Sequence, residues 1–99
     1  MDKNFAYGQA REHLEKSLAI QKEIGDRNGE AGSYTNLGNV YLSVGEYEKA
    51  REHLEKSLAI HKEIGNKNGE ASSSASLGAV YRSVGEYEKA REQDRKSVV

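Results

Sequence analysis

Residues 7–46 read YGQAREHLEKSLAIQKEIGDRNGEAGSYTNLGNVYLSVGE, and this stretch decides the fold because the chain repeats it. Residues 47–86 carry it again with 29 of the 40 positions identical, and a third copy runs from Tyr87 to Val99. A period of this size is typical of solenoids, in which each unit buries its apolar face only by stacking on its neighbours. The repeat therefore predicts a stacked scaffold that offers surface to a partner.

The composition narrows the class of protein further. The 99 residues provide for one domain, 1–99, and the 35% of hydrophobic residues are spread evenly, as a thin core requires. The absence of Cys excludes disulfides and thiolate catalysis and fits a cytoplasmic location. A net charge of −1 without a basic patch argues against nucleic acid as a binding partner. We find no signal peptide and no apolar run long enough for a membrane, and we expect no cofactor.

Glycines at twenty-residue intervals mark the predicted helix ends. Gly25, Gly45, Gly65 and Gly85 each follow an apolar-periodic run, where a helix typically ends in the left-handed conformation. The short turns make successive helices antiparallel neighbours. The pattern thus predicts an all-α, antiparallel helix-turn-helix solenoid of about five helices. Their expected ranges are 7–24, 27–44, 47–64, 67–84 and a last helix from residue 87.

Each predicted helix has an apolar stripe, and the second and fourth contain an internal glycine. Asp26 and Asn66 stand where the N-caps of the second and fourth helices are needed. Gly38 and Gly78 each cost about 1 kcal/mol relative to Ala, and close approach of a neighbouring helix is the simplest offset. The stripe of the third helix follows steps of three and four through Tyr47, Ala50, Leu54, Ser57, Leu58 and His61.

These positions resemble the tetratricopeptide repeat, from Tyr7 to about Ser97. The match rests on Tyr34, Leu37, Gly38, Tyr41, Gly45, Tyr47, Ala50, Leu54 and Ser57, and in the next copy on Leu77, Gly78, Tyr81, Gly85, Tyr87, Ala90 and Ser97. The usual repeat has 34 residues. The forty-residue length is similar to that of Pins/LGN-type polarity adaptors and kinesin light chains. This resemblance implies that the first helix of each repeat, the A helix, lines a concave groove that binds extended peptides, and that the second, the B helix, lies behind it.

The resemblance divides the chain into a half repeat (7–25, B helix only), a full repeat (26–65) and a second repeat with a degenerate end (66–99). In the second repeat Ser74 replaces Tyr34, which thins the packing of its A helix. Asp94 stands where Leu54 stood, so a carboxylate falls on the stripe of the last helix. Either this helix is exposed on that face or it frays, and of the two we expect fraying beyond about Gln93.

Comparison of the two copies points to a candidate binding face. Positions 32, 35, 39 and 42 differ between copies and are spaced as one helical face, whereas positions 37, 40, 41 and 44 are identical. Asn36 and Asn39 can donate to and accept from a peptide backbone, and Arg82 can pair with an acidic residue; neutral divergence of a solvated face stays an alternative. The groove candidates are Thr35, Asn36, Asn39, Leu42, Ser72, Ser76 and Arg82.

Catalytic and metal sites are not expected. His13, His53 and His61 lack further ligands, so we expect surface or partly buried histidines, and the serines at 72–74 have no positioned base. The sequence predicts a non-catalytic scaffold or adaptor for a protein or peptide partner. The alternative is a fragment that forms homo-oligomers through its two uncapped ends.

Overall fold

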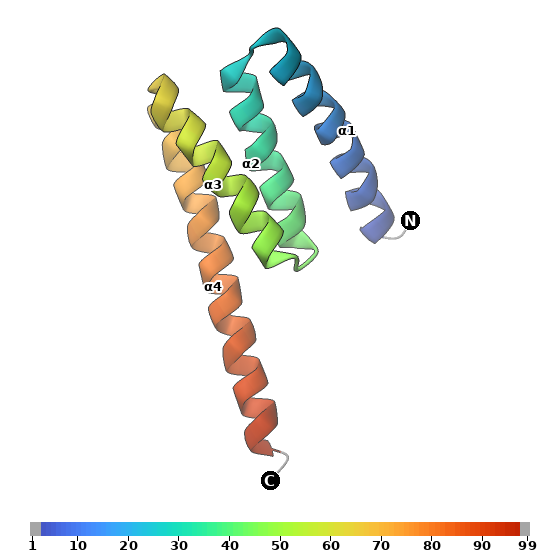
Figure 1. The fold of residues 1–99 in the computed structure, drawn as a ribbon. Coiled ribbons are helices and arrows are strands. Elements are labelled where there is room, and N and C mark those ends of the chain that lie inside the picture. Colours follow the sequence, from blue (N-terminus) through green and yellow to red (C-terminus); the bar gives the residue numbers. More distant parts are fainter. Residues whose placement is uncertain (1–2, 98–99) are drawn as a thin grey trace.

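The computed structural model describes the backbone of residues 3–97 and the side chains of residues 4–93. Within these bounds the chain forms four α-helices and no strand, which confirms the all-α class. They are α1 (Lys3–Ile24), α2 (Arg27–Ser43), α3 (Tyr47–Ile64) and α4 (Lys67–Ser97). Successive helices run in opposite directions (Figure 1). The Cα radius of gyration is 15.8 Å, against about 13 Å for a compact domain of this length, so the stack is elongated.

The three turns follow the predicted cap chemistry. Gly25, Gly45 and Gly65 have φ values of 74°, 80° and 73°, the left-handed region in which glycine carries no Cβ penalty. Asp26 accepts a hydrogen bond from the backbone N–H of Gly29 at 2.9 Å, and Asn66 accepts the equivalent bond at the same distance. These side chains satisfy N–H groups that the first helical turn leaves unpaired, so both predicted N-caps are confirmed.

The main core lies where α2 crosses α3. Its buried residues are Leu37, Tyr41, Ala50, Leu54 and Val80. A Cβ added to Gly38 would lie 2.5 Å from Leu54 Cγ and 3.3 Å from the Ala50 carbonyl oxygen. The two helices therefore approach as closely as a bare Cα permits, which confirms the predicted reason for this glycine. A second cluster of Ala31, Tyr34 and Ile60 joins the same helices further along.

Helix α2 is the centre of the stack. It contacts α1, α3 and α4, whereas α1 contacts no other described helix than α2 (Figure 1). The α2–α4 contact sets side by side two helices whose sequences are related by the forty-residue repeat. The arrangement therefore leaves α1 covered on one side.

The prediction of five helices is wrong, because the two expected helices 67–84 and 87 onward form one helix of 31 residues. Gly85 is helical and, unlike the three turn glycines, has no positive φ. At the equivalent turn after Gly45, the returning helix α3 is held by Leu54, which is fully buried. The third copy offers Asp94 at that position, so a returning helix would have no apolar anchor there, and α4 instead continues past α3 (Figure 1).

Two further predictions for the second repeat change with this continuous helix. Gly78 has no atom within 4 Å of an added Cβ, so close approach does not explain it. The backbone is helical through Ser97, so fraying beyond about Gln93 is wrong for the described backbone; the side chain of Asp94 lies outside the described residues. Ser74 is exposed where Tyr34 is buried, in agreement with thinner packing.

Candidate functional site

Two asparagines form the polar exposed stripe of α2. Asn36 and Asn39 are both exposed and lie three residues apart on one side of the helix, and Ser43 continues this side four residues later. In the described part of the chain, neither side-chain amide has a hydrogen-bond partner. The backbone carbonyl oxygen of Asn39 accepts a bond from Ser43 Oγ at 3.0 Å. We call Asn36 and Asn39 the asparagine stripe. Its amides can pair with the N–H and C=O groups of an extended peptide.

Two other candidates on α2 face the neighbouring helices instead. The Thr35 hydroxyl lies 2.5 Å from Ser57 Oγ and 3.4 Å from Ser73 Oγ, so intramolecular hydrogen bonds engage it. Leu42 packs against the main core. Thr35 and Leu42 thus meet neighbouring helices, whereas Asn39, one helical turn from Thr35, is exposed. The sequence comparison alone did not separate the side of α2 that meets α4 from the side that meets solvent.

The candidates on α4 are dispersed along its first half. Ser72 and Arg82 are exposed, and Ser76 is half-buried. Ser72 and Ser76 are one helical turn apart, whereas Arg82 lies more than a turn further along. Ser72 and Ser76 therefore lie close together along α4, and Arg82, the one basic candidate, lies further along the same helix.

A buried cluster of hydroxyls and one imidazole joins α2, α3 and α4. His61 Nδ1 lies 3.1 Å from Ser73 Oγ and 3.3 Å from Ser57 Oγ, and the two hydroxyls are 2.8 Å apart. The side chain of His61 is buried, with the residue 5% exposed, so the expectation of a surface or partly buried histidine is wrong. Gln21 and Ser33 are equivalent in the repeat to His61 and Ser73. They make a corresponding contact, in which Gln21 Oε1 accepts a hydrogen bond from Ser33 Oγ at 2.6 Å. The conserved spacing of these serines on the apolar stripes is the signal that sequence reasoning missed.

This cluster is structural. Ser57 and Ser73 are fully buried, so a substrate has no access to the hydroxyls beside the imidazole. A Cβ added to Gly69 would lie 2.2 Å from His61 Cδ2, so a glycine is needed to seat the ring. Among the described residues, no group of three His, Asp or Glu side chains is placed to hold a metal ion.

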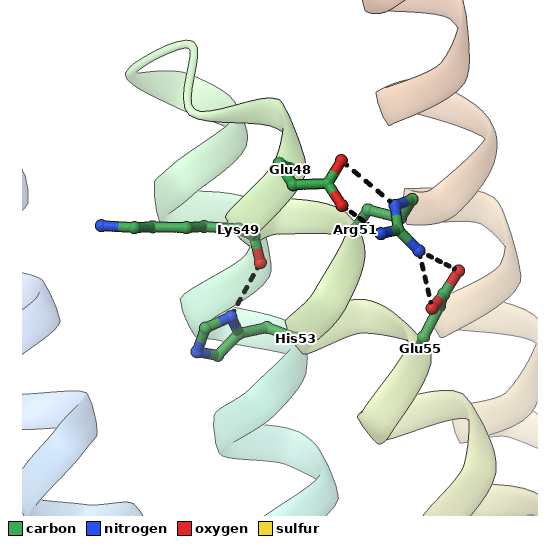
Figure 2. A network of polar contacts seen from close by, with 5 residues as sticks. All are labelled: Glu48, Lys49, Arg51, His53 and Glu55. Atoms are coloured by element: carbon green, nitrogen blue, oxygen red, sulfur yellow. Dashed lines mark hydrogen bonds and ion pairs between the residues drawn. The ribbon is translucent and has the colours of Figure 1, made fainter.

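The exposed side of α3 carries an ion-pair network (Figure 2). Arg51 donates to both oxygens of Glu55 at 3.0 Å and to Glu48. The Glu48 and Glu55 carboxylates raise the pKa of Arg51, and the hydrogen bond from Arg51 lowers the pKa of Glu48. On the neighbouring side, His53 Nδ1 lies 2.7 Å from the Lys49 carbonyl oxygen. These contacts support helix α3, and such exposed pairs each contribute little stability.

The turns between repeats are tied by polar side chains. Arg27 donates to Glu63 at 2.6 Å and to Glu30 at 3.1 Å, and these carboxylates raise the pKa of Arg27. Asn66 donates from Nδ2 to Asn28 Oδ1 at 2.8 Å, which joins the starts of α2 and α4. These bonds join α2, α3 and α4 at the end of the stack where α2 and α4 begin.

Comparison with known proteins identifies the class. The sequence profile described as the tetratricopeptide repeat matches residues 5–63 and again residues 29–98. The chain therefore belongs to the tetratricopeptide repeat family. Repeats of this family generally mediate protein–protein interactions and are typically not enzymes. No protein in the curated comparison matches the chain.

A solved structure shares the fold. The apo form of RapI is 30% identical in sequence, with a TM-score of 0.75 over 94% of this chain. The match covers 34% of RapI, so this chain spans about a third of that protein. None of the described helices is long and apolar enough to cross a membrane.

Proposed function

We propose that the chain is a non-catalytic adaptor that binds a peptide segment of a partner protein along its A helices. The asparagine stripe carries the proposal, because it sets two unengaged amides on the exposed side of the most firmly held helix. An exposed Asn has no packing role, and its donor and acceptor match those of a peptide backbone. Ser72 and Ser76 of α4 extend the proposed groove beside α2.

The finer assignment rests on resemblance. The forty-residue period is similar to that of Pins/LGN-type adaptors and kinesin light chains, so we propose the long-repeat subtype and an extended peptide as ligand. Arg82 would pair with an acidic residue near one end of this peptide. Thr35 and Leu42 would support the groove from below, since hydrogen bonds and core packing engage them. The absence of Cys favours a cytoplasmic location for this activity.

The test uses a displayed library of random dodecapeptides selected on the immobilised chain. Selected peptides should bind Asn36→Ala/Asn39→Ala at least about tenfold more weakly, since each lost bidentate amide removes about 1 kcal/mol. Glu52→Ala/Lys62→Ala is the matched control, because both residues are exposed on α3 and should leave affinity unchanged. Equal binding to wild type and to the asparagine variant, with unchanged helical content, would contradict the proposal.

A further inference from the structure

The N-terminal end of the stack has an uncovered apolar surface. A cleft of about 360 Å³ opens between α1 and the end of α2, and Tyr7, Val40 and Val44 help to line it. In the second repeat, the residues equivalent to these valines are covered: Val80 is 1% exposed, and Val84 packs against the main core. Both lie in or against the core cluster that contains Leu37 and Tyr41 of α2 together with Ala50 and Leu54 of α3. The cleft beside α2 therefore marks a place that α2 helps to fill for the equivalent valines of α4.

The other end of the stack exposes an A-helix surface. Leu77, Gly78 and Tyr81 of α4 are equivalent to Leu37, Gly38 and Tyr41 of α2, which pack on α3. Leu77 is half-buried against the main core, whereas Gly78 and Tyr81 are exposed. Tyr41 is 7% exposed, whereas Tyr81 is 57% exposed. Gly38 is in close contact with Leu54, whereas nothing lies within 4 Å of an added Cβ at Gly78. This surface is open because α4 continues straight through Gly85.

The two surfaces are complementary because the chain already contains the same pair inside its core. Residues 10–20 of α1 are identical to residues 50–60 of α3, and Leu77, Gly78 and Tyr81 repeat the residues of α2 that pack on α3. We propose that the chain of residues 1–99 associates head to tail, with the Leu77–Gly78–Tyr81 surface of one copy docked on the Tyr7–Ala10–Leu14 surface of α1 in the next. The occupant of each surface is thus a second copy.

The internal interface specifies the contacts. Gly78 would lie against Leu14, as Gly38 lies against Leu54. Tyr81 would stack by His13, as the ring of Tyr41 lies 5.0 Å from that of His53. Leu77 would cover Val40 of the next copy, so a single docking event covers both surfaces. The contact is heterologous and leaves a free end on each copy, so it generates open chains that grow with concentration.

Two substitutions block one surface each without disturbing the fold. Gly78→Leu fills open space in the single copy, favours the helix, and puts a side chain where the interface needs a bare Cα. Ala10→Arg puts a charged side chain on α1 at the position of the fully buried Ala50. Gly32→Leu is the matched control. It makes the same change at a helical glycine whose surroundings are also open, and Gly32 belongs to neither docking surface. Circular dichroism checks that all three keep their helical content.

The measurement is light scattering behind size-exclusion chromatography at protein concentrations from about 5 μM to about 1 mM. This range brackets dissociation constants on the order of micromolar to millimolar. The mass of the wild type and of Gly32→Leu should rise with concentration above the 11.0 kDa of one copy. Gly78→Leu and Ala10→Arg should each stay at one copy, with association weakened at least about tenfold by the overpacked contact. Their equimolar mixture should form a dimer and stop there, because each variant supplies the surface that the other lacks.

Several results would overturn the proposal. One is a constant mass of one copy for the wild type. Another is a mixture of the two blocked variants that stays monomeric while the wild type associates. Self-association of Ala10→Arg that Gly78→Leu lacks would show that α4 surfaces pair with each other. Asn36→Ala/Asn39→Ala should keep the wild-type mass curve, so failure of peptide binding and failure of head-to-tail association are distinguishable.

Discussion

Two equivalent glycines should respond in opposite directions to the same substitution. Gly38 of α2 and Gly78 of α4 occupy the same position in successive repeats and are both inside helices. Replacing a helix-interior glycine by alanine favours folding by about 1 kcal/mol, because alanine loses less backbone entropy. At Gly78 this gain should be fully expressed, since the added methyl meets no atom within 4 Å.

At Gly38 the added methyl meets the core. It would lie 2.5 Å from Cγ and 2.9 Å from Cδ2 of Leu54, which is fully buried and cannot move aside, and 3.3 Å from a backbone oxygen. Overpacking of this kind costs about 1–3 kcal/mol. The net effect of Gly38→Ala is therefore a loss of about 0–2 kcal/mol. The two variants should differ by about 1–3 kcal/mol in the free energy of unfolding.

Thermal unfolding followed by circular dichroism at low micromolar concentration measures this difference. For a domain of this length 1 kcal/mol corresponds to about 4–8 °C in Tm. Gly78→Ala should melt above the wild type, Gly38→Ala at or below it, and the two should lie at least about 4 °C apart. If Gly38→Ala gains as much as Gly78→Ala, then α2 and α3 do not approach at this glycine and the reasoning is refuted.

Three further predictions follow from packing, polar bonding and charge. Leu54→Ala should lower the free energy of unfolding by about 2–5 kcal/mol, and Leu14→Ala by clearly less because Leu14 is half-buried; urea unfolding compares them. His61→Gln should keep the wild-type stability within about 1 kcal/mol, since Gln21 makes the equivalent bond; a larger loss would show that the ring itself is required. Because Arg51 lowers the pKa of Glu48, their pair stabilises the fold above the ordinary carboxyl value of 4.5, and this contribution is lost as pH falls through the lowered value. Glu48→Gln should therefore flatten the acid side of the stability–pH curve, and an unchanged curve would contradict the pairing.

Local chemistry made the first three helices predictable. Glycine at twenty-residue intervals and the Asp26 and Asn66 caps act within a few residues, so the sequence alone locates those ends. The forty-residue repeat then indicates which helices are neighbours. The close approach at Gly38 follows because a helix-interior glycine needs a packing reason.

The last helix was not predictable in the same way, because its end depends on a tertiary contact. Gly85 has the same local sequence as Gly45, SVGEYEKARE, yet only Gly45 adopts a positive φ. What differs is the anchor that a returning helix would bury, Leu54 in one case and Asp94 in the other. Turn residues permit a turn, whereas packing decides whether it forms.

The candidate site was predicted in part for a related reason. Variation between copies marks the residues that packing does not hold, and this selected Asn36 and Asn39, which are exposed. Thr35 also varies, but its hydroxyl bonds to Ser57 across the helix interface. A position that differs between the two copies can face solvent, or it can face a neighbouring helix whose contact also differs between the copies. The sequence comparison does not separate these two cases. The buried position of His61 depends on Gly69, which lies on another helix and eight residues away.

The even spacing of the left-handed glycines at 25, 45 and 65 has a genetic consequence. The contacts between helices join neighbouring helices, as Gly38 and Leu54 do, or positions almost one repeat apart, as Asn28 and Asn66 do. A change in length therefore preserves this pattern of contacts only in steps of forty residues. Segments 10–20 and 50–60 are identical in amino-acid sequence, and they lie one such step apart. Misaligned recombination there would add or remove one whole unit and leave each remaining interface in register. A gene of this kind can thus lengthen or shorten its product without passing through an unfolded intermediate form.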